Sequence, residues 1–402
     1  MKIVHISQYY DDNAGYQENI FPSYQAKLGC DVTVITSTLR SGFIYKDREV
    51  AAGEYTENGF TLKRIPVNGE LKNRFVIFND LFKYLSEEKP DYIYHYSITA
   101  PSIKDVAKYK KENPNVFFAV DNHADLNNSG KNKVWKVIYY NFFWRMFLHK
   151  YDAYVNVYFG ASPNRCLFME EELGVPKDKI RLLPIGSDED NAKVSMSKED
   201  FFKKFNLDKD KFIITNGGKI TPEKEVSKIL EAFSRIRNED INLVLFGRIA
   251  DPKVEQLIKK DNRIKYIGWL NRQDTLAMLS YSDIGIWNKL HTTLLEDSVA
   301  VGLPLILRYY GNTSYLIKDS GLYLYEGSVR EIQDKLAYVV NNRQVVQEFM
   351  NNSHKLLQIL SYNNIAKESI EYMESMTPKT SHQIFMSQDC TDFAYKDLRF
   401  IK

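Results

Sequence analysis

The stretch from Ile213 to Leu307 is the most informative part of this chain. It begins with an apolar run that leads into Asn216-Gly217-Gly218-Lys219-Ile220-Thr221-Pro222-Glu223-Lys224, and it later contains Leu294-Leu295-Glu296-Asp297-Ser298-Val299-Ala300-Val301-Gly302-Leu303-Pro304. Two lysines beside flexible glycines suit a diphosphate. A carboxylate at the start of a helix suits sugar hydroxyls, from which it can accept hydrogen bonds. Together the two motifs predict a nucleotide-sugar ligand.

Around these motifs, short apolar runs alternate with amphipathic stretches, which is the pattern of parallel βα units. In the second half the expected elements are Phe212–Asn216, Val226–Arg237, Asn242–Gly247, Lys253–Lys260, Lys265–Gly268, Asp274–Leu279, Ile284–Trp287, Leu295–Val301 and Leu305–Leu307. Helical periodicity returns over Val329–Asn341 and Val345–Met376, with an interruption at Tyr362-Asn363-Asn364.

The first half contains a similar series. Strands are expected at Lys2–Ser7, Asp31–Thr36, Tyr92–Tyr96, Val116–Val120, Ala153–Val157 and Ile180–Pro184, and helices at Tyr16–Leu28, Asp80–Glu88 and Val134–His149. Gly53–Pro66 indicates an inserted hairpin or extended strand. A polar, acidic run after Ile185 separates the two series and is typical of a domain linker. The sequence therefore predicts an α/β protein of two Rossmann-like domains facing a cleft, over residues 1–190 and 191–360.

Composition limits the class of protein. The chain has 402 residues, and a net charge of +2 argues against nucleic acid as its main partner. Three widely spaced cysteines, Cys30, Cys166 and Cys390, indicate a reducing compartment and favour the cytoplasm. The first residues turn polar too early for a secretory signal, and no apolar run reaches the roughly 20 residues that span a bilayer.

The order of motifs resembles that of the retaining glycosyltransferases with the two-Rossmann (GT-B) architecture, specifically the family 4 branch of the glycosyl transferases group 1. The likeness covers most of the chain. It rests on Gly15-Tyr16-Gln17-Glu18, Asp121-Asn122-His123, Asn216–Glu225, Ile267-Gly268-Trp269-Leu270, Glu296–Pro304 and Ser361–Ser375. The resemblance implies a first loop at Gly15, an active-site histidine at His123 and a base-contacting loop at Leu270. It also implies a helix at 361–376 that crosses back to the N-terminal domain, which leaves residues 377–402 as an arm or tail.

One departure from the family pattern is serious. The family carries two glutamates eight positions apart, and here the first position is Asn288 while the second is Glu296. The glycine-rich loop between them is replaced by Lys289-Leu290-His291-Thr292-Thr293. An amide at position 288 can orient a sugar hydroxyl, but it supplies no charge.

The lysines are the first candidates for chemistry, because transfer of a sugar from a nucleoside diphosphate builds negative charge on the leaving pyrophosphate. Lys219 and Lys224 can both face one diphosphate, supplemented by backbone N–H groups of Gly218, Thr292 and Thr293. Gly217 is expected to bind the donor as part of the same loop. The alternative is that both lysines are merely solvated, although a cation near a helix start opposes the helix dipole.

Two further side chains are candidates. Glu296 can accept hydrogen bonds from the ribose diol, or it can be an ordinary capping glutamate, and only the resemblance favours ribose. His123 follows an apolar strand at the ligand-binding end of a parallel sheet, where it can contact the donor sugar. Its alternative is a structural histidine held between Asp121 and Asp125. His95 is the weaker candidate and is expected only to line the cleft.

Two Asp-x-Asp matches, Asp188-Glu189-Asp190 and Asp208-Lys209-Asp210, can in principle hold a divalent cation. Both are better interpreted as solvated surface. We therefore expect no metal and no cofactor, with the lysines in place of a cation and a UDP-sugar as the favoured donor.

The tract from Lys131 to Lys150 mixes bases with aromatic residues. Such a helix can seat a protein on a membrane surface and offer a groove to a lipid-linked acceptor. The alternative, which we favour, is a mostly buried domain helix with a basic rim, because apolar residues occur on nearly every face.

The sequence thus predicts a retaining, metal-independent hexosyltransferase that uses a nucleoside-diphosphate sugar and a glycan acceptor. The resemblance implies a lipid-linked acceptor in bacterial surface polysaccharide synthesis, with an enzyme in the cytoplasm or peripheral on the inner membrane face. The alternative is a catalytically silent binding or scaffold protein, motivated by Asn288. A nucleotide-sugar epimerase fits less well, because the donor loop lacks an added general base.

Overall fold

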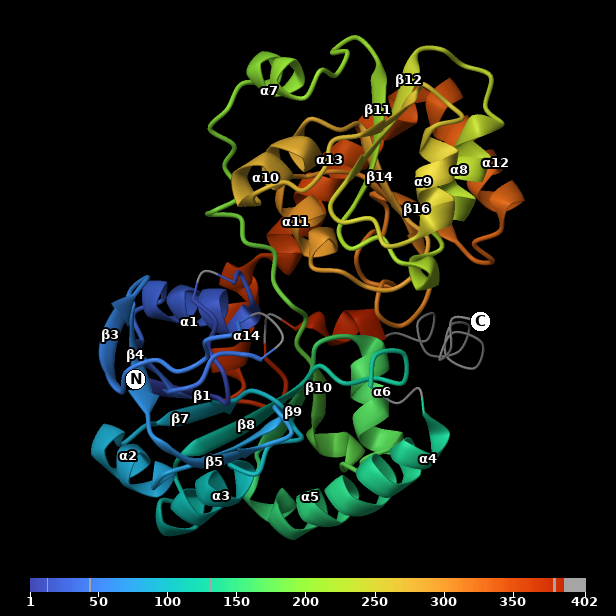
Figure 1. Ribbon diagram of the computed structural model, residues 1–402. Coiled ribbons are helices and arrows are strands. Elements are labelled where there is room, and N and C mark those ends of the chain that lie inside the picture. The colour runs from blue at the N-terminus through green and yellow to red at the C-terminus, as the bar shows by residue number, and fades with distance from the viewer. Residues whose placement is uncertain (13, 43–44, 130–131, 379–380, 387–402) are drawn as a thin grey trace. The chain divides into compact units, whose positions relative to one another are not determined.

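The chain forms two compact α/β units in the computed structural model, which describes residues 1–12, 14–42, 45–129, 132–378 and 381–386 (Figure 1). Unit 1 comprises Met1–Gly186 together with the segment that begins at Tyr362, and unit 2 comprises Ser187–Ser361. A mainly parallel sheet lies at the centre of each unit. The predicted fold of two Rossmann-like domains is therefore confirmed.

Unit 1 is built on an eight-stranded sheet in which only β3 and β4 pair antiparallel. Its spatial order is β10 (Ile180–Leu182), β9 (Val157–Gly160), β8 (Phe117–Asn122), β7 (Tyr92–His95), β1 (Lys2–Ser7), β2 (Asp31–Ser37), β4 (Phe60–Ile65) and β3 (Gly53–Glu57). Its central strands are buried along nearly their whole length, as expected for a parallel sheet covered on both faces.

Helices cover that sheet from two sides. In Figure 1, α1 (Gln17–Lys27) and α14 (Tyr362–Glu371) lie on one side, while α2 (Leu81–Glu88), α3 (Ile103–Glu112) and α5 (Arg145–Tyr151) lie on the other. The remaining elements of unit 1 are the hairpin β5 (Val67–Leu71) and β6 (Phe75–Phe78), α4 (Lys133–Trp135), the π-helix η1 (Lys136–Trp144), η2 (Asp152–Tyr154), α6 (Pro163–Glu171), η3 (Lys177–Lys179) and η5 (His382–Met386).

Unit 2 has a six-stranded sheet in which every neighbouring pair is parallel. The order is β13 (Ile264–Tyr266), β12 (Ile241–Phe246), β11 (Phe212–Gly217), β14 (Ile284–Trp287), β15 (Leu305–Arg308) and β16 (Gly321–Leu324). Its helices are α7 (Lys198–Lys204), η4 (Pro222–Lys224), α8 (Val226–Ser234), α9 (Pro252–Ile258), α10 (Arg272–Ser280), α11 (Leu294–Ala300), α12 (Val329–Asn341) and α13 (Arg343–Leu360).

The helix α14 returns the chain to unit 1 after unit 2 is complete. Ser361 is extended and separates α13 from α14, which explains the predicted interruption. The Tyr362 ring stacks on Tyr24 of α1 with centroids 5.5 Å apart, and Ile365 and Ala366 are fully buried in the core of unit 1. The predicted crossover of the C-terminal helix is therefore confirmed.

Some predicted elements are wrong in place or type. The strand expected at Ala153–Val157 is instead the 3₁₀ turn η2 followed by β9, because pairing with β8 begins only at Val157. The helix expected at Val134–His149 is divided into α4, η1 and α5. Of residues 377–402, the described part contains η5, where His382 and Phe385 are buried, and Phe393 and Phe400 lie outside the described residues.

A buried carboxylate fastens η5 to α14. Glu368 is fully buried, and it accepts hydrogen bonds from the backbone N–H of His382 at 3.0 Å and from the Tyr372 hydroxyl at 3.2 Å. Its second oxygen contacts His382 Nδ1. Because none of these groups reaches water, the carboxylate satisfies donors that would otherwise be buried without a partner.

We predict that Glu368→Ala lowers the free energy of unfolding by about 3 kcal/mol, because it leaves those buried donors without an acceptor. Urea denaturation followed by circular dichroism measures the loss. Glu374→Ala, at an exposed carboxylate on the same segment, is the matched control and is expected to change little. Equal stability of the two variants would contradict the role given to Glu368.

Candidate functional site

The strand order of unit 2 reverses between β11 and β14. From β11 the chain moves outward through β12 and β13, and it then crosses to β14, β15 and β16 on the other side. In open parallel sheets, ligands bind at the carboxyl ends of the strands at such a reversal. The segments that follow β11 and β14 are residues 218–225 and 288–293, which contain most of the donor-site residues predicted from the sequence.

Lys219 and Lys224 lie close enough for their charges to interact. Lys219 is exposed and Lys224 is half-buried, and desolvation together with the charge of Lys219 lowers the pKa of Lys224. In the described part of the chain neither ammonium group forms an ion pair with a carboxylate, although Lys228 and Lys289 nearby do. Two cations in this state favour the binding of an anion with more than one charge.

The turn that leads into these lysines depends on Gly218. Its φ of +102° is in the region that favours glycine, and its N–H donates to the carbonyl of Phe246 at 3.1 Å. A Cβ built on Gly218 would lie 3.7 Å from Lys224 Nζ and 3.8 Å from Thr292 Oγ1. The glycine backbone is therefore the surface toward which the lysine and the threonine converge. The preceding Gly217 is the last residue of β11, and its carbonyl accepts from Trp287 Nε1 at 3.2 Å.

Glu296 is buried at the start of α11, and His291 is its one side-chain hydrogen-bond partner among the described residues. Its Oε1 lies 2.7 Å from His291 Nε2, while Oε2 is buried without a hydrogen-bond partner among the described residues. Thr293 is the N-cap of α11, but the cap makes no side-chain hydrogen bond. Glu296 thus does not bond the helix as a capping glutamate does, and one of its oxygens is left to accept from a ligand.

Asn288 follows β14 and is also buried. Its Nδ2 donates to the carbonyl of Gly327 at 3.1 Å and to Glu225 Oε2 at 3.4 Å, while Oδ1 is buried without a partner among the described residues. The amide is therefore fixed by its nitrogen. Only its oxygen is left for a ligand hydroxyl.

Glu225 is a site residue to which the sequence interpretation gave no role. Desolvation acts to raise its pKa, but hydrogen bonds from Lys228 and Lys289 outweigh this and hold the pKa below its usual range. Its backbone has φ +53°, which costs a non-glycine residue free energy. The sequence signal was available: a glutamate next to Lys224, in the turn that follows the donor loop. Position 288 itself carries an amide, but the carboxylate of Glu225 lies beside it.

Leu270 follows β13, at the same edge of the sheet. It is 5% exposed, whereas Trp269 beside it is 77% exposed. The loop is joined to the donor loop region through Gly247, whose N–H donates to the Gly268 carbonyl at 2.7 Å. If this loop contacts a base, the exposed indole of Trp269 offers more surface than the buried side chain of Leu270.

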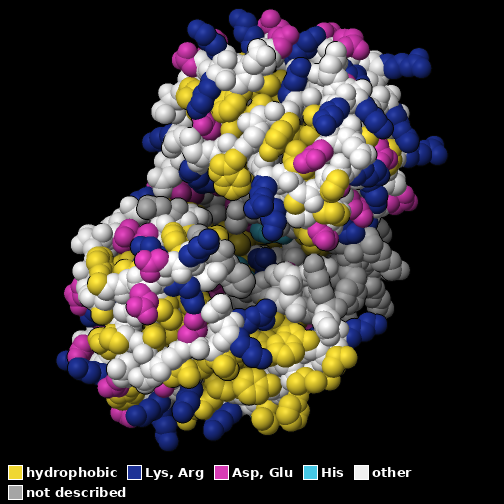
Figure 2. Space-filling view, viewed as in Figure 1, with side chains coloured by type: hydrophobic (Ala, Val, Ile, Leu, Met, Phe, Trp, Pro, Cys, Tyr) yellow, Lys and Arg dark blue, Asp and Glu magenta, His cyan; other side chains and the backbone are white. Residues whose placement is uncertain are grey.

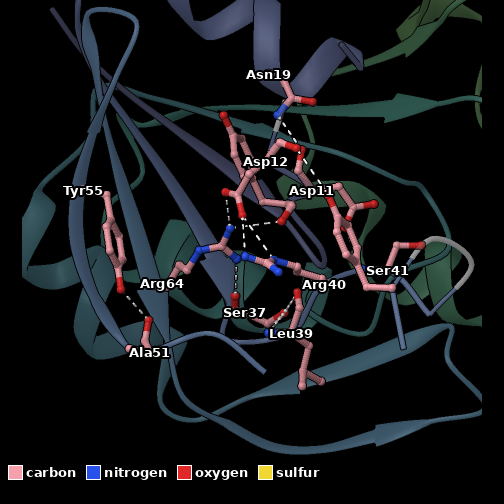
Figure 3. A network of polar contacts seen from close by, with 12 residues as sticks. Asp11, Asp12, Asn19, Ser37, Leu39, Arg40, Ser41, Ala51, Tyr55 and Arg64 are labelled. Atoms are coloured by element: carbon pink, nitrogen blue, oxygen red, sulfur yellow. Dashed lines mark hydrogen bonds and ion pairs between the residues drawn. The ribbon is translucent and has the colours of Figure 1, made fainter. Parts of the chain in front are cut away.

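In unit 1, the loop after β1 that contains Gly15 is anchored by charged side chains (Figure 3). Asp12 accepts from the buried Arg64 at 2.8 Å and from Arg40, and Asp11 Oδ1 accepts from the backbone N–H of Ser41 at 2.7 Å. Asn19 of α1 donates to the carbonyl of Asp11. Gly15 itself is exposed with φ +69°, and a Cβ there would meet no atom within 4 Å.

His123 comes directly after β8 and is held by two residues. Its Nε2 lies 2.9 Å from the buried Asp121 Oδ2 and 2.7 Å from Gln17 Oε1 at the start of α1. Both partners are acceptors, so the proton is on Nε2 and Nδ1 can accept a hydrogen bond. The side chain is 38% exposed. Desolvation raises the pKa of the neighbouring Glu18 to about 7, although a hydrogen bond from its own backbone N–H acts to lower it.

The alternatives for the other sequence candidates are partly wrong. Asp125, the other carboxylate named for His123, accepts from the backbone N–H groups of Asn127 and Asn128. His95 is fully buried, and burial lowers its pKa to about 4, so it does not line an open surface. Asp188 is buried and bonded to Asn191 rather than solvated. In the described residues, no three His, Cys, Asp or Glu side chains cluster closely enough to hold a metal ion.

One protein-family model matches a part of unit 2. Residues 197–356 match the family model described as Glycosyl transferases group 1, and the match lies within unit 2. The chitobiosyldiphosphodolichol beta-mannosyltransferase of Kluyveromyces lactis is 23% identical over 233 residues, which is 49% of this chain and 51% of that protein. The chain thus spans about half the length of the curated relative it matches.

Solved structures show the same fold over nearly the whole chain. A glycosyltransferase from Rickettsia africae ESF-5 is 16% identical with a TM-score of 0.67, over 93% of this chain and 97% of that one. HepE of Anabaena, solved with UDP and glucose, is 12% identical with a TM-score of 0.65, over 94% of this chain and 100% of that one. The likeness to these structures shows the GT-B fold, and the family model matches within unit 2.

We predict that Lys219→Ala and Lys224→Ala each weaken UDP binding by about 2 kcal/mol, the scale of a desolvated charge-assisted contact. Because the pKa of Lys224 is lowered in the free protein, wild-type affinity should also fall as pH rises through that pKa, below the range of an ordinary lysine. This alkaline loss should be absent in Lys224→Ala. Calorimetry with UDP over a pH series measures both effects.

Lys260→Ala is the matched control, since Lys260 is exposed on unit 2 away from these strand ends. Wild-type affinity in both loop variants would remove the diphosphate assignment.

Proposed function

We propose that this chain is a retaining, metal-independent glycosyltransferase that moves a hexose from a nucleoside-diphosphate sugar to a glycan acceptor. The single observation that carries the proposal is the lysine pair after β11, with lowered pKa at Lys224 and no carboxylate partner among the described residues. A leaving diphosphate is the group whose growing charge such a pair stabilises, and it is stabilised more in the transition state than in the ground state.

The proposed mechanism needs no enzymic nucleophile. The bond from the anomeric carbon to the diphosphate oxygen breaks, the incoming hydroxyl attacks from the same face, and its proton passes to the leaving phosphate. Lys219 and Lys224 stabilise the diphosphate, Glu296 Oε2 accepts from the ribose, and Asn288 Oδ1 accepts from a donor hydroxyl. No step requires a metal ion, because the lysines supply the positive charge.

The donor is proposed to be a UDP-sugar. HepE of Anabaena was solved with UDP and glucose, which supports a uridine nucleotide for a chain with the same fold. A lipid-linked acceptor is supported by the name of the Kluyveromyces lactis relative, whose acceptor is a dolichol-linked sugar. The placement in bacterial surface polysaccharide synthesis rests on the family resemblance of the motifs.

A catalytically silent binding protein is the second candidate. Asn288 favours it, since an uncharged amide replaces a carboxylate. Glu225 weighs against it, because its ionised carboxylate contacts the same amide and supplies negative charge beside position 288. The two candidates differ in whether the wild-type protein turns over any donor.

The test is a panel of UDP-, GDP- and ADP-sugars with wild type, Asn288→Glu, and Asn288→Glu combined with Glu225→Gly. We predict wild-type turnover, and a loss in Asn288→Glu on the order of 10- to 100-fold, because two carboxylates would meet where an amide now donates to Glu225. Glu225→Gly removes the second carboxylate and relieves the positive φ, so the double variant should recover part of the loss.

Hydrolysis and transfer to acceptor extract are both measured, and nucleotide affinity checks that the variants still bind. An inactive wild type across the panel, together with activity gained in the double variant, would overturn the enzyme and establish the silent relative.

We further predict that His123→Ala reduces turnover by at least about tenfold while UDP affinity stays near wild type, because the residue lies in unit 1 and its proposed contact is to the sugar. Steady-state kinetics and calorimetry separate the two effects. His149→Ala, at an exposed histidine of the same unit, is the control. Unchanged turnover in His123→Ala would leave His123 as a structural residue.

A further inference from the structure

The outer face of α4, η1 and α5 exposes large apolar side chains. Val134 is 70% exposed, Phe142 66%, Met146 60% and Ile138 59%. Figure 2 shows hydrophobic side chains gathered along the lower edge of the view, in the region that holds α4 and α5 in Figure 1, with Lys and Arg side chains beside them. A contiguous exposed apolar patch on this scale marks an interaction site more often than chance exposure.

The π-helix gives this segment two apolar faces. Tyr139, Tyr140, Trp144 and Leu148 are buried, so one side of the helix packs into unit 1. The wider π turn leaves the intervening pairs, including Phe142 and Phe143, on the opposite side. The expectation of a mostly buried helix with a basic rim is therefore wrong, because the second apolar side faces solvent.

The β5–β6 hairpin extends the patch. Phe75 contacts Tyr139 and Trp144, with ring centroids 6.2 Å and 5.6 Å apart. Leu71 pairs with Phe75 across the hairpin, and Ile77 lies two residues after Phe75, so both point to the strand face that Phe75 uses. Leu71 is 56% exposed and Ile77 52%. The apolar surface thus continues from the helix onto the hairpin.

Exposed cations surround this surface. Residues 132–151 include no acidic residue, and Lys133, Arg145 and Lys150 are exposed. At the hairpin tip, Lys72 and Arg74 are exposed on a tight turn in which the Arg74 N–H donates to the Leu71 carbonyl. Three acidic residues on neighbouring segments form ion pairs: Glu70 with Arg48, Asp152 with Lys179, and Glu172 with Lys136.

We infer that this surface, formed by α4, η1, α5 and the β5–β6 hairpin, docks unit 1 on a membrane with anionic lipid headgroups. Exposed aromatic and aliphatic side chains within a cationic rim are what an interfacial segment presents to such a surface, and each basic residue near it adds attraction. A protein partner would instead need a matching acidic rim and a fitted apolar face. No helix in the described ranges is both long and apolar enough to cross a bilayer, so the segment lies in the interface plane.

This inference goes beyond the proposed function and depends on no step of donor chemistry. If a lipid-linked acceptor is used, docking brings unit 1 to the phase in which that acceptor lies. The two proposals can fail separately, because vesicle binding is measured without donor or acceptor and UDP affinity is measured without vesicles.

The test is co-sedimentation of the full chain with phosphatidylcholine vesicles and with equimolar phosphatidylcholine and phosphatidylglycerol vesicles. We expect binding to the anionic vesicles that weakens as salt rises. The double variant Phe142→Ser/Phe143→Ser should lower the partition coefficient by at least about tenfold. The triple variant Lys133→Glu/Arg145→Glu/Lys150→Glu should lower it similarly.

Controls on unit 2 carry equivalent changes: Tyr338→Ser for an exposed aromatic residue and Lys259→Glu/Lys260→Glu for exposed cations. These should bind vesicles as wild type does, and all variants should retain UDP affinity and thermal stability. The inference is overturned if wild type binds neither vesicle, or if the phenylalanine variant binds like wild type. It is equally overturned if wild type is a lipid-free dimer that Phe142→Ser/Phe143→Ser converts to a monomer, since a second copy then covers the surface.

Discussion

The candidate site depends on two ammonium groups that are held close together, with no carboxylate paired to either of them in the described part of the chain. Lys224 is desolvated and lies in the field of Lys219, so its charged form is disfavoured in the folded protein. The carboxylate next in sequence belongs to Glu225, yet it bonds Lys228 and Lys289 instead. The backbone of Glu225 has a φ of +53°. The chain thus accepts backbone strain at one residue, and the neighbouring cation stays available for an anion.

The parallel sheet brings the segments that form this site together at one edge. β11 and β14 are adjacent only because the chain runs out to β13 and then crosses back, so segments 70 residues apart in sequence meet at one edge. The amide of Asn216 spans the junction by donating to the Ile286 carbonyl at 2.6 Å. In unit 1 a candidate residue also lies directly after a strand: His123 follows β8. Asp121 and Gln17 fix which of its ring nitrogens carries the proton.

The sequence predicted the two βα series, the crossover helix and the residues that gather after β11 and β14, because each depends on local apolar patterning and on the rule that ligands bind at strand ends. It did not predict the π-helix, since Tyr139 and Trp144 pack on Phe75 and Tyr140 packs on Phe168, which are tertiary contacts that local patterning does not contain. It also missed the β5–β6 hairpin, whose turn uses Lys72 and Asn73 at positive φ where glycine is the usual signal.

Asn288 and Glu225 show why a residue-by-residue comparison with a family pattern is incomplete. At position 288 the sequence alone indicates a lost carboxylate and therefore lost chemistry. In the folded chain, Asn288 Nδ2 is 3.4 Å from the carboxylate of Glu225. A carboxylate is therefore present beside position 288, but residue 225 carries it. A carboxylate at position 288 would repel the carboxylate of Glu225. An amide there donates a hydrogen bond to Glu225 and keeps its carbonyl oxygen for the ligand. The departure at 288 and the strained glutamate at 225 are therefore one arrangement, and each makes physical sense only with the other present.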